Sequence, residues 1–169
     1  MQPADPARLP PSLARFLALW EAKRGARRMP ARRDFTFEDL WPWLGRLNLI
    51  AVEGDEARFV VFSEVSTRLY GREMTGKRLS EFVPRVLADA AIADHRAFMA
   101  AGGIPMSKLV DITYEYREMR WTRLVLPLAD DERTVKRYFV ALHVDEIRAD
   151  PESGIRPLLD GARKDPIIR

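Results

Sequence analysis

Two neighbouring side chains near the middle of the chain have groups that commonly take part in chemistry. The imidazole of His95 could ligate iron, and the carboxylate of Asp94 could act as a general acid or base, as could those of Glu64 and Asp89. Residues 86–101 are rich in alanine and predict a helix, on which adjacent side chains point about 100° apart. Asp94 and His95 therefore cannot form a carboxylate–histidine pair. We predict no catalytic residue and no metal site, and we interpret His95 as an exposed helix residue.

The composition excludes several further kinds of site. The chain has 169 residues, of which 47% are hydrophobic and 31% charged, and it contains no cysteine. These proportions are typical of one globular domain. The lack of cysteine excludes disulfides, zinc–thiolate and iron–sulfur sites, thiol catalysis and chromophores attached through sulfur. No apolar run approaches the roughly 18 residues of a membrane span, so we expect a cytoplasmic protein with no membrane partner.

A basic segment at residues 23–33 raises the alternative of nucleic-acid binding. Its cations are Lys23, Arg24, Arg27, Arg28, Arg32 and Arg33. The net charge of the chain is only +3, and no aromatic side chains alternate with these cations as a single-strand reader would require. We interpret the segment as a solvated connector and keep a nucleic-acid-binding accessory protein as an alternative.

An apolar stripe at helical spacing lies near the N-terminus. Residues 1–11 are rich in proline and alanine and predict a flexible lead, after which Ser12 is a candidate N-cap and Gly25 a candidate helix end. In this flanking segment, residues 1–28, the stripe consists of Leu13, Phe16, Leu17 and Trp20. Such a stripe must be covered by a sheet, by a second subunit or by both. We predict that these four residues form a homodimer interface.

The order of elements after residue 46 predicts an α+β fold. A strand hairpin is expected first, then a block of short helices, then three antiparallel strands, at residues 47–62, 63–101 and 110–142 respectively. The strand at 138–142 is apolar on both faces, which is typical of a central strand covered on both sides, here by the N-terminal helix. Residues 148–169 contain three prolines and predict a loosely held tail.

Four segments resemble a known family. MPARRDF at residues 29–35 and DLWPWLG at 39–45 resemble the opening of a family of short, stand-alone bacterial proteins in the PAS domain superfamily. YGREMTGKRL at 70–79 resembles its mid-domain turn, and LPLADD at 126–131 its late strand. The resemblance implies a PAS-like domain over residues 29–147: an antiparallel sheet with a helical block on one face and an N-terminal flanking helix.

The resemblance also implies a function. PAS domains serve as sensory or protein-interaction modules without chemistry of their own, so this chain would act through an unknown signalling partner protein. His95 lies where haem-binding members place their proximal ligand, but no arginine-rich clamp for the propionates is evident nearby. We therefore expect no haem and no covalent flavin, and the sequence requires no cofactor. An enzyme of the ketosteroid-isomerase type, which also has a pocket between sheet and helices, is the alternative.

We expect a ligand pocket between the last strands and the alanine-rich helix. Strand alternation places Leu124, Leu126 and Leu128 on one face of their strand. It likewise places Val140, Leu142 and Val144 on one face of the next strand. We predict that these two sets share one side of the sheet. The expected pocket residues are Ile92, His95, Phe98, Met99, Tyr114, Tyr116, Leu124, Leu126, Val140 and Leu142. Only the two tyrosines and His95 are polar. The expected ligand is therefore a small, mainly apolar molecule.

Overall fold

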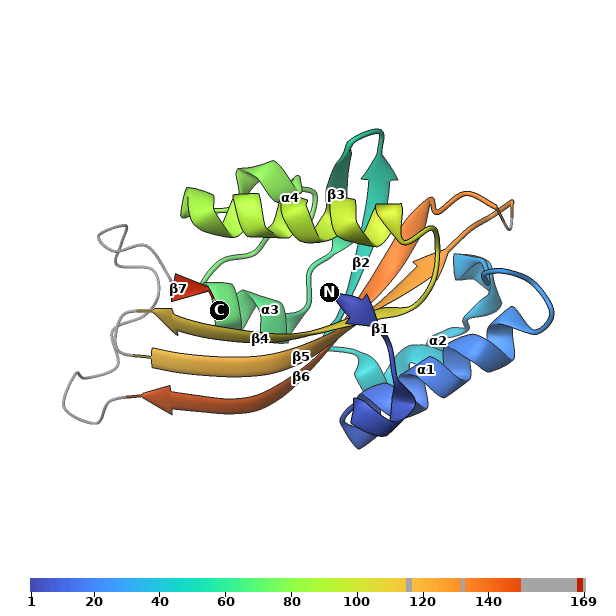
Figure 1. Cartoon of the computed structure of the whole chain (residues 1–169), viewed down its shortest axis with the longest axis horizontal. Coiled ribbons are helices and arrows are strands. Elements are labelled where there is room, and N and C mark those ends of the chain that lie inside the picture. The colour runs from blue at the N-terminus through green and yellow to red at the C-terminus, as the bar shows by residue number, and fades with distance from the viewer. Residues whose placement is uncertain (115–116, 132, 150–166, 169) are drawn as a thin grey trace.

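One antiparallel sheet forms the centre of the computed structural model, which describes residues 1–114, 117–131, 133–149 and 167–168 (Figure 1). Its strands follow the order β1-β4-β5-β6-β2-β3, and β7 pairs with β4. Their bounds are β1 Gln2–Pro3, β2 Leu47–Glu53, β3 Glu56–Val61, β4 Met106–Tyr114, β5 Arg117–Leu128, β6 Arg137–Ala149 and β7 Ile167–Ile168. The α+β class is therefore confirmed. The strand predicted to be central is also confirmed, since β6 lies between β5 and β2.

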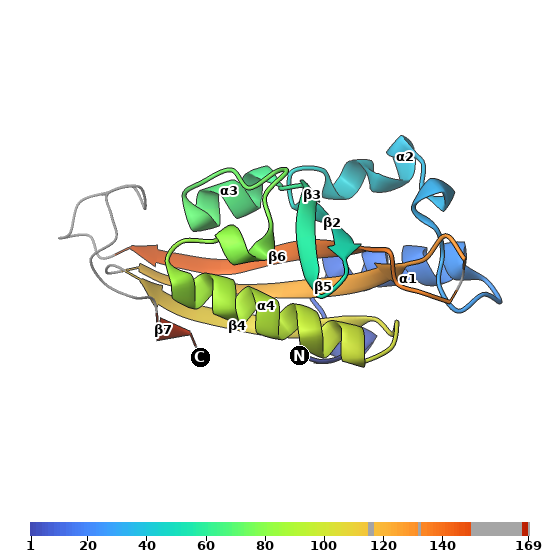
Figure 2. The same cartoon turned by 90° about the horizontal axis from the view of Figure 1, so that it is seen from above.

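The helices lie on both faces of this sheet, as Figure 2 shows. They are α1 (Pro11–Arg24), α2 (Phe37–Leu40), α3 (Glu64–Tyr70) and α4 (Arg85–Ala100), with 3₁₀ turns η1 (Pro6–Arg8), η2 (Arg32–Asp34), η3 (Trp41–Trp43) and η4 (Leu79–Glu81). The Ser63 hydroxyl accepts from the backbone N–H of Ser66 and caps α3, and Gly71 ends α3 with a φ of 69°. Gly25 ends α1 as predicted. Ser12 lies inside α1 and does not cap it, since its hydroxyl is 3.1 Å from Nδ1 of His143.

The apolar stripe of α1 packs on the sheet of the same chain. Its four residues are at most 3% exposed, and they are Leu13, Phe16, Leu17 and Trp20. The ring centroid of Phe16 lies 5.7 Å from that of Phe139, and the indole N–H of Trp20 donates to the carbonyl of Pro127 at 2.8 Å. The predicted cover of the second face of β6 is confirmed. The assignment of these four residues to a dimer interface is corrected, because the chain's own sheet already covers them.

The pairing of β5 with β6 decides which side chains share a face. Leu124 lies opposite Ala141 and Leu126 opposite Phe139, so both leucines face α1. Val125 lies opposite Val140, on the other face of the sheet. The prediction that the leucines of β5 share a side with Val140 and Leu142 is therefore wrong. The two sets differ by one residue in register, which moves every side chain to the opposite face.

The segments predicted to be loose at the N-terminus are parts of the fold. Gln2 and Pro3 pair with β4, so the lead is not free of the sheet. Of the predicted loose tail at residues 148–169, residues 148–149 belong to β6 and Ile167–Ile168 form β7, which pairs with β4, so the prediction is wrong for these four residues. Residues 150–166 and 169 of the predicted tail lie outside the described residues. None of the helices in the described part of the chain combines the length and the apolar character that a membrane crossing requires.

Candidate functional site

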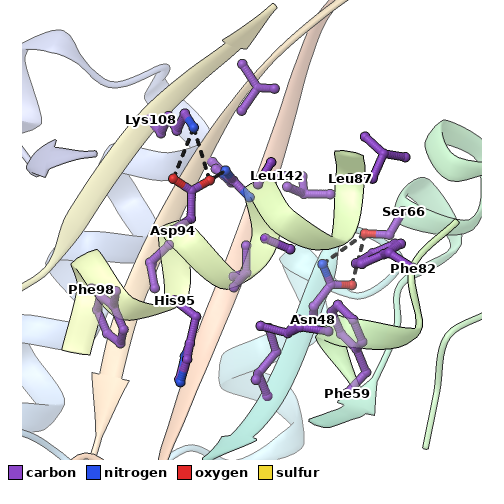
Figure 3. Close-up of a pocket in the computed structure, with 18 of the residues that line it drawn as sticks. Asn48, Phe59, Ser66, Phe82, Leu87, Asp94, His95, Phe98, Lys108 and Leu142 are labelled. Atoms are coloured by element: carbon purple, nitrogen blue, oxygen red, sulfur yellow. Dashed lines mark hydrogen bonds and ion pairs between the residues drawn. The ribbon is translucent and has the colours of Figure 1, made fainter. Parts of the chain in front are cut away.

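A cavity of about 80 Å³ lies between α4 and the sheet (Figure 3). Its walls are mostly apolar and come from every layer around it: Ile50, Phe59, Phe62, Leu79, Phe82, Leu87, Phe98, Val110, Ile112, Val125, Val140 and Leu142. The helical period of α4 and the two-residue period of β4 explain why these residues face the cavity. On α4 the side chains at Leu87, Ala91, Asp94 and Phe98 recur at helical spacing, and on β4 those of Lys108, Val110 and Ile112 alternate. The cavity is thus a mainly apolar space between the sheet, α4, α3 and η4.

His95 and Tyr138 form a polar pair in the wall. Nδ1 of His95 lies 3.0 Å from the hydroxyl of Tyr138, and the two rings stack with centroids 5.8 Å apart. Burial lowers the pKa of His95, and burial raises the pKa of Tyr138 above its usual range. A neutral imidazole can accept the proton of the phenol. His95 is only 5% exposed, so its interpretation as an exposed helix residue is wrong.

Asp94 is the centre of an ion-pair cluster formed by Asp94, Lys108 and Arg123. Nζ of Lys108 lies 3.0 and 3.1 Å from the two carboxylate oxygens, and the guanidinium of Arg123 donates to one of them. The side chains of Asp94, Arg123 and Lys108 are 13%, 17% and 25% exposed, so the cluster is largely buried at the edge of the cavity. It connects α4 to β4 and β5. Figure 3 shows Asp94 and His95 leaving α4 in different directions, as the helix geometry predicts.

A third polar group lies at the end of the cavity next to α3. The side-chain oxygen of Asn48 accepts from the backbone N–H of Ser63 at 2.6 Å and from the hydroxyl of Ser66 at 3.0 Å. Both Asn48 and Ser66 line the cavity and are buried. A buried amide needs such partners, since an unsatisfied one costs stability. This group fixes the start of α3 against β2.

The predicted pocket residues fall into three sets. His95, Phe98, Val140 and Leu142 line the cavity. Ile92 and Met99 pack against the core from the next face of α4 and are not among the cavity residues, while Leu124 and Leu126 lie under α1. The side chain of Tyr114 and the whole of Tyr116 lie outside the described residues.

Sequence reasoning missed the charged and amide groups of the site. Helix geometry excludes a pair between Asp94 and His95, but it does not show that Asp94 faces the cavity, as the structure does. Lys108 and Arg123 lie on the cavity face of β4 and β5, and both were missed because lysine and arginine usually face solvent. The signal that could have found Lys108 is its two-residue spacing from Val110 and Ile112.

The basic segment at residues 23–33 is largely engaged by the fold. Lys23 pairs with Asp39 at 2.5 Å, and Arg27 pairs with Asp34 at 2.7 Å. The guanidinium of Arg32 donates to the carbonyl of Phe35 at 2.9 Å. The interpretation as a solvated connector is therefore corrected to a segment that fastens α1 to η2 and α2. In the described part of the chain, no three histidine, cysteine, aspartate or glutamate side chains are arranged to hold a metal ion.

The family model of the PAS domain matches residues 8–143. The LOV domain of the blue-light photoreceptor Aureochrome1 in its light state is similar at 15% identity and a TM-score of 0.44, over 66% of this chain and 90% of that chain. A light-oxygen-voltage domain studied with a flavin analogue is similar at 14% identity and a TM-score of 0.45, over 64% and 83%. A search of the curated proteins gave no match.

Proposed function

The chain belongs to the PAS domain family, and from that premise we propose that it is a non-enzymatic sensor that binds a small ligand between α4 and the sheet. PAS domains generally act as sensory or interaction modules. The proposal adds that this one responds to a mainly apolar ligand and signals through a partner protein.

The observation that carries the proposal is the cavity itself. Its walls include ten apolar side chains that are each at most 6% exposed: Ile50, Phe59, Phe62, Leu79, Phe82, Phe98, Val110, Ile112, Val125 and Leu142. Well-packed interiors have few voids larger than a water molecule, so a space of about 80 Å³ with apolar walls favours a ligand. Burial of each ligand CH₂ in it contributes about 0.8 kcal/mol.

The size of the cavity also disfavours large cofactors. Sites for drug-sized ligands have volumes of about 300–1,000 Å³, several times the 80 Å³ found here. The chain has no cysteine with which to form a covalent flavin adduct. We therefore propose a small organic ligand and no haem or flavin.

The alternative functions have less support. An isomerase-type base needs a free carboxylate in the pocket, and Asp94 is ion-paired with both Lys108 and Arg123. A nucleic-acid binder needs cations available to phosphates, and Lys23, Arg27 and others of the basic segment are engaged within the chain. A homodimer remains part of the proposal, but with a surface other than the covered stripe of α1.

The experiment that tests the proposal is a ligand screen by thermal unfolding and native mass spectrometry. Isobutanol and toluene at many times their dissociation constants should raise the Tm of the purified chain, because a ligand that binds only the folded state stabilises it. The cavity-filling variant Leu142→Phe should lose the response, while Leu126→Ala, on the other face, should keep it. No shift with any small apolar probe, and no retained mass, would contradict ligand binding.

A further inference from the structure

The ion-pair cluster has one positive charge in excess. Lys108 and Arg123 contribute two cations, and Asp94 contributes one carboxylate. Among the lining residues that the structure describes, Asp94 is the only carboxylate. The excess charge lies on side chains that are at most 25% exposed, where solvent screens it less than on the surface. An uncompensated charge at such a place favours an anionic partner.

The cluster also has unused hydrogen-bond donors. A lysine ammonium has three N–H groups and an arginine guanidinium five, and the Asp94 carboxylate engages them through three contacts. Within the described part of the chain, Nε of Arg123 is buried and has no hydrogen-bond partner. Buried donors without partners are rare and costly in native proteins. An anion in the cavity would supply the acceptor that this side chain lacks.

The charged cluster and the apolar walls occupy different parts of the cavity. The cluster lies at the more accessible edge, while Phe59, Phe82 and Val125 behind it are at most 6% exposed. The charge of Arg123 also acts on Tyr138 of the neighbouring strand β6: burial raises the pKa of Tyr138, and the Arg123 charge acts against that rise. A ligand that fits a charged edge and an apolar interior has an anionic head and a short apolar body.

We infer that the cavity binds a small monocarboxylate, with its head at Lys108 and Arg123 and its carbon chain between α4 and the sheet. This inference rests on the proposed ligand-binding function and names its substrate class. One carboxylate balances the single excess charge, and charge-assisted hydrogen bonds to arginine and lysine are about twice as strong as neutral ones. The remaining affinity comes from burial of the chain.

The test compares the alkanoates from propionate to hexanoate with the corresponding neutral amides, by calorimetric titration of the full chain at constant ionic strength. We expect each carboxylate to bind at least tenfold more tightly than its amide. Affinity should rise about fourfold per methylene until the cavity is full.

Three variants and one control locate the head group. Arg123→Met should weaken hexanoate binding at least tenfold, and Lys108→Met should weaken it in the same direction. Arg120→Met is the matched control on the same strand, since Arg120 pairs with Asp111 at 2.6 Å and is 56% exposed. Asp94→Asn should tighten hexanoate binding several-fold, because it removes the carboxylate that competes for the two cations. A purely structural cluster would not produce that gain.

The outcomes separate the inference from the proposed function. If amides and carboxylates bind equally well, or if Arg123→Met binds hexanoate as the wild type does, the carboxylate inference is wrong and ligand binding stands. If neither series binds, the carboxylate inference is wrong, and the response to isobutanol and toluene decides whether ligand binding stands. The comparison of acid with amide on the wild-type chain needs no variant, so it decides the question even where Arg123→Met fails to fold.

Discussion

Arg123 on β5 lies directly opposite Leu142 on β6, so a guanidinium and a leucine side chain share the cavity face of the sheet. The arginine is not solvated there. It pairs with Asp94 on α4, 29 residues earlier in the chain, and this ion pair holds α4 over Leu142. A charged edge and an apolar interior therefore belong to the same small space. The first use of the ion pair is structural, since it keeps α4 on the sheet.

Asp94→Asn should destabilise the unliganded chain by about 1–3 kcal/mol. The cost lies between those of exposed and of fully buried pairs, because the three side chains are 13–25% exposed. The control is Asp89→Asn on the same helix, whose pair with Arg85 is 60–77% exposed and should contribute less than about 0.5 kcal/mol. Urea unfolding measures both. Equal losses in the two variants would contradict the role of the cluster in holding α4.

Leu142→Ala and Leu126→Ala should differ in cost although both remove the same atoms. Leu126 is 0% exposed and packed beneath α1, so its truncation should cost about 2–5 kcal/mol. Leu142 borders an existing cavity, so its truncation enlarges a space that is already there, and a cost at or below about 2 kcal/mol, the lower end of that range, is expected. The Leu142→Ala variant should also accept longer ligands than the wild type. A cost for Leu142→Ala as large as that for Leu126→Ala would mean that the space is filled.

Stability should fall as the pH drops below about 6.5, and His95 should contribute to the fall. Burial lowers the pKa of His95 in the folded chain; Glu56 acts against this shift and Arg96 acts with it. The unfolded chain therefore binds a proton at a pH where folded His95 does not, so acid favours unfolding. His95→Gln cannot titrate, and its stability should change less between pH 7 and 5 than that of the wild type. Parallel pH profiles for the two proteins would exclude this contribution.

Phe16→Ala should weaken the fold and leave the oligomeric state unchanged. Phe16 is 0% exposed against Phe139 and Trp43, and loss of such a ring costs about 3–5 kcal/mol. Phe37→Ala on α2 is the control, because Phe37 is 60% exposed and should contribute little. Unfolding and light scattering report stability and size. A stable Phe16→Ala monomer from a dimeric wild type would restore the stripe as a dimer interface.

Cells that express the chain with added haem precursor should yield protein without a Soret band. The physical reason is volume, since a porphyrin is far larger than the cavity of about 80 Å³. His95→Ala should not change the visible spectrum. Stoichiometric Soret absorbance that disappears in His95→Ala would show that the cavity opens and that His95 ligates iron.

Local signals in the sequence were enough for the helices and strands between residues 11 and 149 but not for β1 and β7. Ser63 and Gly71 mark the ends of α3 because a hydroxyl cap and a positive φ are needed at those places whatever the rest of the chain does. The apolar residues of β6 indicated a central strand for a similar reason, since both of its faces must be covered.

The residues of the site could not be predicted, because they depend on strand register and on contacts between distant elements. The loop after Leu128 sets the β5–β6 register, and a shift of one residue there exchanges Leu124 for Val125 on the cavity face. A buried Arg123 is favourable only because Asp94 reaches it from another element, and neither residue alone indicates the pair. Alternation could therefore identify the faces of each strand but could not match them across the hairpin.

A crystal of the chain under xenon pressure tests the central claim most directly, because xenon enters small apolar cavities without any need to know the natural ligand. The account predicts an anomalous scattering peak between α4 and the sheet, in contact with Val110, Val125 and Leu142. A cavity closed by its own side chains, with no xenon peak at that place, would contradict it.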